Sequence, residues 1–114
     1  MRLQRRILTN VTSEARRTLA LIRECIEEER FALTEHFYQR MENRGLFWPD
    51  VQAVIDSPSD VRSQGMDDHN RPKWIIAGQA ALGGEIEIVC AIETRKVGGK
   101  NSSDTEFITI YWED

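Results

Sequence analysis

A change of hydrophobic periodicity near Pro58 constrains the fold of this chain more than any other feature. Before it, apolar residues recur at the three-to-four-residue spacing of one face of an α-helix. After it, apolar and polar residues alternate, which indicates half-buried β-strands. Helices followed by a meander of strands are typical of α+β domains. We therefore predict a single α+β domain over residues 1–114, with a helical part at about 12–57 and a strand meander at about 60–112.

The helical part contains start and stop signals for three helices. Thr34 is a favourable N-cap for the second helix, and Gly45 is a favourable stop, because glycine readily adopts the left-handed conformation that ends a helix. Residues 30–34, which precede the second helix, are expected to form a short extended link or a strand. The helices are predicted at residues 13–29, 35–44 and about 48–56.

The second part contains turn signals that separate four strands. A polar turn over 67–72 and a tight turn over 82–84 favour antiparallel neighbours, and residues 97–103 have the composition of a longer flexible loop. We therefore predict a four-stranded, mainly antiparallel sheet with the N-terminal helices packed on one of its faces. The strands are predicted at about residues 60–66, 73–79, 85–94 and 105–112.

Alternation within the strands predicts which face of the sheet meets the helices. In the last strand, Ile108, Ile110 and Trp112 share one side and Phe107 lies on the other. We expect the isoleucine-bearing sides of the strands to pack against the helices. The opposite face is expected to be the more open one, and it carries Glu87, Glu93, Thr109 and Tyr111.

Composition limits the class of protein. The chain has 15 Lys and Arg against 19 Asp and Glu, a net charge of −4, and its 40% of hydrophobic residues is enough for one core. No apolar stretch has the length of a membrane span or of a signal-peptide core, so we expect a cytoplasmic protein with no membrane partner. The isolated Cys25 and Cys90 exclude a disulfide framework and a zinc cluster. No cofactor motif is present, and His69, in a polar turn beside two aspartates, has too few companions for a metal site.

The charge is distributed unevenly along the chain. Residues 1–47 contain nine arginines against seven glutamates, whereas residues 48–114 contain six basic and twelve acidic residues. A polyanionic partner is therefore expected to meet the N-terminal half. The alternative is an ordinary solvated helix surface of mixed charge.

The densest polar constellation is His36, Arg40 and Arg44. Four-residue spacing on a helix places the three side chains within a stripe about 80° wide. Imidazole can move a proton near neutral pH, and a guanidinium can hold phosphate oxygens in a forked geometry, so the stripe suits phosphate chemistry. The alternative is structural, with the arginines paired to neighbouring carboxylates and His36 capping or packing.

Several short motifs follow one another along the chain: Leu33-Thr34-Glu35-His36, Arg40-Met41, Arg44-Gly45, Asp50-Val51 and the closing Ile108-Thr109-Ile110-Tyr111. Together they resemble a bacterial family called domain of unknown function 4258, which is related to the BrnT and RelE ribonuclease toxins. The family pattern is roughly L-T-x-H-x-x-x-R-M-x-x-R-G, a short helix starting near D-V, and a closing I-T-V-Y. Residues 72–78 also resemble a strand of BrnT-like toxins, and the resemblance covers about residues 31–112.

The resemblance implies a RelE-like fold, metal-independent cleavage of mRNA, and an antitoxin protein as partner. Within this hypothesis we expect His36 to transfer the proton and Arg40 and Arg44 to stabilise charge on the phosphate. Candidate RNA contacts outside the stripe are Lys73, Tyr111, Arg95 and Lys96, for which core packing or a plain surface loop is the alternative.

A second functional hypothesis comes from a different class of protein. The chain would be a non-catalytic binding module of the same fold, which binds a protein partner or self-associates. Its negative sheet face would then meet a basic partner. Salt dependence of RNA binding separates the two hypotheses, because phosphate contacts give a steep slope.

Overall fold

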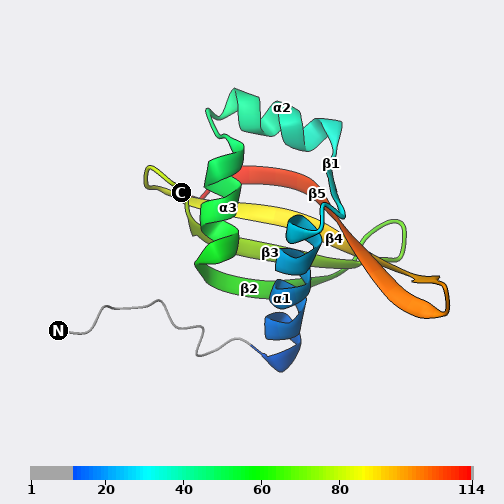
Figure 1. The fold of residues 1–114 in the computed structure, drawn as a ribbon. Helices are drawn as coiled ribbons and strands as arrows, with labels where there is room; N and C mark the ends of the chain where they lie inside the picture. The colour runs from blue at the N-terminus through cyan, green and yellow to red at the C-terminus, as the bar shows by residue number, and fades with distance from the viewer. Residues whose placement is uncertain (1–11, 114) are drawn as a thin grey trace.

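The computed structural model describes residues 12–113 and has an α+β fold, as predicted (Figure 1). The helices are α1 (Ser13–Glu27), α2 (Glu35–Asn43) and α3 (Trp48–Asp56). The strands are β1 (Phe31–Leu33), β2 (Pro58–Met66), β3 (Pro72–Gln79), β4 (Glu85–Val97) and β5 (Lys100–Trp112). None of the helices in this range combines the length and the apolar character needed to cross a membrane.

The strands form one five-stranded mixed sheet in the order β1-β5-β4-β3-β2. The prediction of four strands is wrong by one, because residues 31–33 form β1 and pair in parallel with β5, Phe31 opposite Thr105 and Leu33 opposite Phe107. The other pairs are antiparallel. A three-residue strand is too short to show a period, and its partner lies far along the chain, so the sequence left its pairing open.

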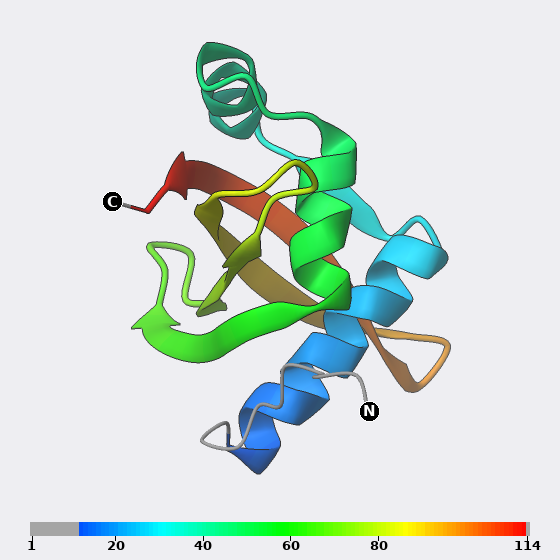
Figure 2. The same ribbon diagram turned by 90° about the vertical axis from the view of Figure 1, so that its left-hand side faces the viewer.

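The helices are distributed unequally around the sheet. α1 and α3 cover one face, whereas α2 lies beyond the β5 end of the sheet, next to β1 (Figures 1 and 2). The opposite face, called the open face below, has no helix of the described chain on it. Phe37 and Met41 anchor α2 in the common core, and Phe37 is fully buried. The Phe37 ring lies 5.7 Å from that of Phe107.

The β4–β5 hairpin corrects the predicted flexible loop at 97–103. The two strands continue to Val97 and restart at Lys100, so the turn consists of Gly98 and Gly99 alone. Both have positive φ values, 60° and 83°. Two-residue hairpin turns need this conformation, which glycine adopts without strain. The hairpin therefore forms a ribbon that extends beyond the rest of the sheet (Figure 1).

A β-bulge in β5 corrects the predicted faces of that strand. Val89 pairs with Thr109 but the next residue, Cys90, pairs with Phe107, so Ile108 is an extra residue. Phe107 consequently lies in the core with Ile110, and Ile108 does not. Strict alternation predicted the reverse for residues 107 and 108. A bulge shifts the alternation by one position without leaving a signature in the apolar pattern.

The C-terminal end of α1 lies two residues before the predicted one. The helix ends at Glu27, and Glu29 has a left-handed φ of 58°. Three successive glutamates are unfavourable at the negative end of a helix dipole, which explains the early end. Cys25 and Cys90 are both buried free thiols, as expected, and burial raises the pKa of Cys90 to about 12.

Candidate functional site

Both ends of α2 are fixed by specific hydrogen bonds. At the N-terminus, Thr34 Oγ1 accepts from the Phe37 amide and donates to the Ile108 carbonyl, each over 3.0 Å. At the C-terminus, the Leu46 amide donates to the Met41 carbonyl over 2.8 Å, and Gly45 between them has a φ of 68°. This is the geometry in which a left-handed glycine ends a helix. The cap hydrogen bonds of Thr34 and the left-handed backbone of Gly45 thus explain why these residue types stand at the two ends of α2.

Three side chains project from this helix in the predicted stripe, His36, Arg40 and Arg44, called the α2 stripe below. Arg40 Nε donates to His36 Nε2 over 3.3 Å at the surface. In this geometry Nε2 of His36 is the acceptor of the bond. Within residues 12–113, neither Arg40 nor Arg44 forms an ion pair with a carboxylate. The α2 stripe therefore presents guanidinium groups that no described carboxylate neutralises.

The nearby Asp50 is not a partner of the stripe. Its Oδ2 accepts from the Phe47 amide over 2.8 Å and its Oδ1 accepts from the Ala81 amide over 2.9 Å. The carboxylate thereby caps α3 and ties its first turn to the β3–β4 turn. This role explains why an aspartate stands at a buried position at the start of a helix.

On the open face of the sheet, Glu87 forms the centre of a hydrogen-bonded network. Its carboxylate accepts from Tyr111 Oη over 2.6 Å and from Arg62 Nη2 over 3.1 Å. Only 6% of Glu87 is exposed, which corrects the expectation of an open glutamate. Burial raises the pKa of Glu87, but the bonds from Tyr111 and Arg62 outweigh it and leave the pKa below its usual range.

Two neighbours of Glu87 are perturbed in the opposite direction. The bond to Glu87 raises the pKa of Tyr111 to about 12, because the negative carboxylate disfavours a phenolate. It likewise raises the pKa of Glu113, which lies beside Glu87. A phenol with a pKa near 12 is a poor proton donor at neutral pH, so the network is better suited to holding strands together than to proton transfer.

Arg71 is the centre of a second cluster on the same face. Its guanidinium lies 2.8 Å from Asp67, 2.9 Å from Glu106 and 3.6 Å from Glu93. Burial raises the pKa of Asp67, but hydrogen bonds from the Arg71 backbone and guanidinium and from the His69 amide outweigh it and lower the pKa to about 2. The charge of Arg71 is therefore balanced by three carboxylates, those of Asp67, Glu93 and Glu106.

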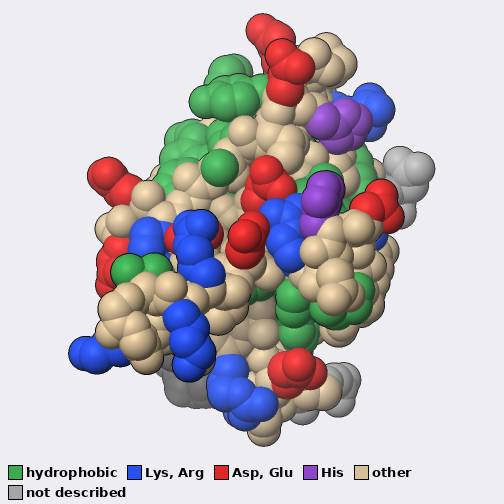
Figure 3. All heavy atoms as spheres, turned by 90° about the vertical axis from the view of Figure 1, so that its right-hand side faces the viewer, with side chains coloured by type: hydrophobic (Ala, Val, Ile, Leu, Met, Phe, Trp, Pro, Cys, Tyr) green, Lys and Arg blue, Asp and Glu red, His purple; other side chains and the backbone are tan. Residues whose placement is uncertain are grey.

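Lys73 and Tyr111 line the same groove of about 500 Å³ on the open face. Thr34 also lines this groove, so the groove extends to the N-cap residue of α2. Asp67, Asp68, His69 and Glu106 also line the groove. Both histidines are visible on the face drawn in Figure 3, where basic and acidic side chains alternate.

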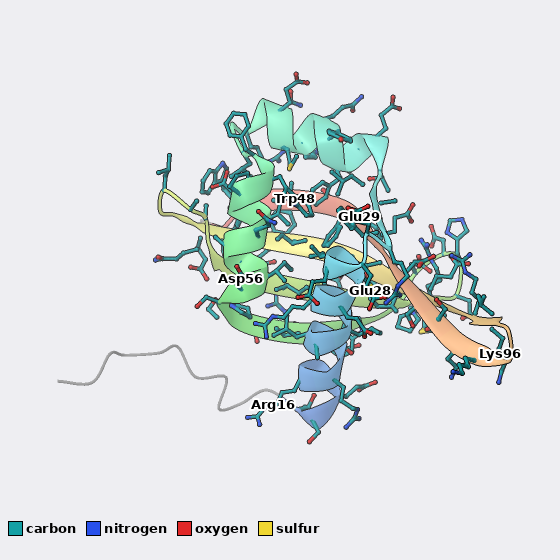
Figure 4. The ribbon with its side chains drawn as sticks, viewed as in Figure 1. Arg16, Glu28, Glu29, Trp48, Asp56 and Lys96 are labelled. Carbon is teal, nitrogen blue, oxygen red and sulfur yellow. The ribbon has the colours of Figure 1, made fainter. Side chains whose placement is uncertain are left out.

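The other two predicted RNA contacts lie outside this groove. Arg95 is paired with Asp104 across the β4–β5 hairpin. Lys96 is exposed and lies near the far end of the hairpin (Figure 4). Trp74 is a core residue. The structure therefore separates the predicted residues into the α2 stripe, the groove and the hairpin.

Two relationships were beyond sequence reasoning. The first is the Arg62–Glu87–Tyr111 network, which depends on the register of β2 and β5 relative to β4. The second is a bond from Trp112 Nε1 to the Arg44 carbonyl over 3.2 Å. No local pattern could reveal this bond, because the two residues are 68 positions apart and the bulge in β5 shifts the register of that strand.

In the part of the chain that the structure describes, no three His, Cys, Asp or Glu side chains are grouped so that they could hold a metal ion. The aspartate of the polar turn is occupied instead, since Asp67 Oδ1 accepts from the amides of His69 and Arg71 over 2.9 and 2.8 Å.

The fold and site define a small α+β protein with a mixed sheet, one open face, and an edge helix whose two half-buried arginines have no carboxylate partner within residues 12–113. Residues 33–112 match the family described as domain of unknown function 4258 (DUF4258). The chain therefore belongs to this family, and the matched range begins at the residue before the α2 cap and ends at Trp112. No curated protein and no solved structure matches the chain.

Proposed function

We propose that this protein is a toxin-like endoribonuclease and that the α2 stripe is its catalytic site. The observation that carries the proposal is the difference between its arginines. Arg40 and Arg44 have no carboxylate partner within residues 12–113, whereas Arg62, Arg71 and Arg95 each have one or more. Donors that are free of carboxylates are what recognition of a phosphate requires.

A comparison of positions within the α2 motif supports the same residues as the catalytic site, because the other positions of the motif have structural roles. Thr34 and Gly45 fix the two ends of the helix, and Met41 is buried in the core. These positions have a structural reason to carry their residues. The side chains of the α2 stripe project to the surface, and the packing of the fold does not require an imidazole or a guanidinium there.

The chemistry that we assign is transfer of the 3′-phosphate of one nucleotide to its own 2′-hydroxyl. His36 takes the proton of the 2′-hydroxyl, the 2′-oxygen attacks phosphorus, and the bond to the 5′-oxygen breaks. The imidazolium returns the proton to that leaving oxygen. Arg40 and Arg44 hold the phosphate oxygens, whose charge increases in the transition state. When Arg40 turns to the phosphate, it frees His36 Nε2 to accept the proton.

The resemblance to BrnT- and RelE-type toxins adds further elements to the proposal. A RelE-like arrangement of the helices and the mainly antiparallel sheet is part of the proposal. The proposed protein acts on mRNA in the cytoplasm, and an antitoxin protein restrains it. Lys73 and Tyr111 in the groove next to Thr34, and Arg95 with Lys96 on the hairpin, are secondary RNA contacts.

A second candidate, a non-catalytic module that binds a basic protein, is favoured by the charge of the open face. Carboxylates outnumber cations there, and the arginines Arg62, Arg71 and Arg95 are each paired with a carboxylate. The carboxylates on this face include Asp60, Asp67, Glu85, Glu87, Glu93, Asp104, Glu106 and Glu113. Such a surface repels phosphates and attracts lysines and arginines.

The test is induced expression in a bacterial host together with RNA cleavage by the purified protein. We expect wild type to slow growth and to cleave single-stranded RNA, and His36→Ala and the double variant Arg40→Ala/Arg44→Ala to do neither. Arg17→Ala is the matched control, since it removes one exposed arginine from another helix. Unchanged growth and intact RNA with the wild-type protein would contradict the proposal and favour the binding module.

A further inference from the structure

The C-terminal end of α2 holds an aromatic residue at the surface. Trp112 Nε1 donates to the carbonyl of Arg44, one of the carbonyls that the end of the helix leaves without a partner. This bond fixes the orientation of the indole beside the last residue of the α2 stripe. Even so, 39% of Trp112 is exposed. A large aromatic ring that is both fixed and exposed is ready to bind another flat group.

The glycine turn before β4 explains how the indole fits. Gly84 has a φ of 90°, and a Cβ atom built there would lie 2.6 Å from Cζ3 of Trp112. The ring therefore lies directly over bare backbone, at a distance that any side chain would prevent. Figure 2 shows the end of β5, this turn and the end of α2 at one corner of the molecule.

A second exposed aromatic residue, Phe47, lies three residues after Arg44 in the chain. Phe47 follows the end of α2 and is 69% exposed, although its backbone is fixed through Asp50 to the turn that contains Gly84. Its ring is thus exposed on a well-anchored backbone. The residues Arg44, Phe47, Gly84 and Trp112 are called the α2 corner below.

We propose that the α2 corner is a base-stacking subsite for single-stranded RNA, in which Trp112 and Phe47 bind bases while Arg44 binds the phosphate between them. The inference rests on the proposed function and names its substrate class. Exposed aromatic rings next to cations are how proteins bind single strands without a sequence preference. A duplex would not bind in this way, because its bases are already stacked and paired.

The experiment measures binding without cleavage. The probe is a short single-stranded RNA with methylated 2′-hydroxyls, which the proposed reaction cannot cleave. We expect the probe to quench the tryptophan fluorescence of the wild-type protein. In Trp112→Phe, which keeps Trp48 and Trp74, we expect the probe to cause no quenching. The same strand annealed to its complement is expected to bind much more weakly.

Affinity changes in three variants identify the source of binding. We expect Trp112→Ala and Phe47→Ala each to raise the Kd of the probe by roughly 5- to 100-fold, which is the loss of affinity expected for one stacked base. Trp112→Phe keeps a ring and should lose less. Leu82→Ala is the matched control, because Leu82 is a fully exposed apolar residue of the same turn that has no ring. Thermal unfolding of each variant identifies any loss that is due to misfolding.

Four results would overturn the inference. One is binding of the probe that the two aromatic variants leave unchanged, and another is no binding of the single strand at all. The third is equal weakening of binding by Leu82→Ala. The fourth is a dimer in solution that Trp112→Ala dissociates, which would make the corner an apolar protein contact. If wild type still cleaves RNA and slows growth in any of these cases, the proposed function stands without this subsite.

Discussion

The arginines of α2 and those of the open sheet face have opposite surroundings. Arg62 and Arg71 are held among carboxylates that are themselves largely buried, such as Glu87 and Asp67. Arg40 and Arg44 lie at the edge of the fold, where the only polar partner found for either guanidinium within residues 12–113 is His36. The same residue type therefore stabilises the sheet in one region and remains available to a ligand in the other. Charge counts over the sequence cannot separate these two uses.

The largest expected effect tests whether α2 is a rigid platform. Phe37→Ala should lower the free energy of unfolding by about 3–5 kcal/mol, because it removes a fully buried ring in contact with the aromatic cluster around Phe107. Urea denaturation measures this change. Tyr38→Ala, at the next position of the same helix and 59% exposed, should cost far less. Equal losses would mean that α2 does not pack on the core through Phe37.

A smaller effect tests the structural role of the sheet network. Tyr111→Phe should destabilise the protein by about 1.5–3 kcal/mol, since it removes a hydrogen bond to the buried Glu87 carboxylate. RNA cleavage should persist, because the proposed catalytic site is the α2 stripe and Tyr111 is only a secondary RNA contact. Tyr38→Phe is the control for loss of an exposed hydroxyl. If Tyr111→Phe abolished RNA cleavage without loss of stability, the catalytic site would lie on the sheet instead.

The pH dependence of stability is a second test of the structural role of the Tyr111–Glu87 bond. The pKa of Tyr111 is raised to about 12 in the folded state, so its contribution is complete below the ordinary tyrosine pKa of 10 and is lost as the pH rises through about 12. The pKa of Glu87 is lowered, so its contribution is complete above the ordinary pKa of 4.5 and is lost as the pH falls further. Unfolding midpoints of wild type and Tyr111→Phe should therefore converge at both extremes. A constant difference across the alkaline range would refute this account.

The smallest expected effect belongs to the α2 stripe itself. Arg40→Ala and His36→Ala should each change the free energy of unfolding by less than about 0.5 kcal/mol, because their side chains form only a surface bond with each other. Arg71→Ala should cost clearly more, since it leaves several carboxylates without their cation. Thermal or urea unfolding of the three variants provides the measurement. A large loss with Arg40→Ala would show that the stripe is architectural.

Much of the fold could be predicted because it rests on local signals. The cap at Thr34, the glycine after α2 and the alternation in β4 are all encoded within a few residues of where they act. The position of the α2 stripe on a helix follows in the same way. These features need no knowledge of distant parts of the chain.

The features that could not be predicted depend on distant pairings or on a shift of register. The parallel pairing of β1 joins residues that are remote in the sequence, and the bulge at Ile108 changes which side chains of β5 face the core. The burial of Glu87 depends on Arg62 and Tyr111, which come from two other strands. Alternation alone placed this glutamate on the correct face but could not show that its neighbours cover it.

The dependence of α2 on β5 has a consequence for synthesis of the chain. The N-cap Thr34 bonds to Ile108, 74 positions later, and the Arg44 carbonyl accepts its bond from Trp112 near the end of β5. When the ribosome has synthesised α2, neither Ile108 nor Trp112 has yet been synthesised. Short isolated helices are only marginally stable in water. The antiparallel hairpins can form from neighbouring segments, whereas the edge that carries α2 closes over a long stretch of chain. Assembly of the α2 stripe is thus expected to be among the last events of folding, after β5 has left the ribosome.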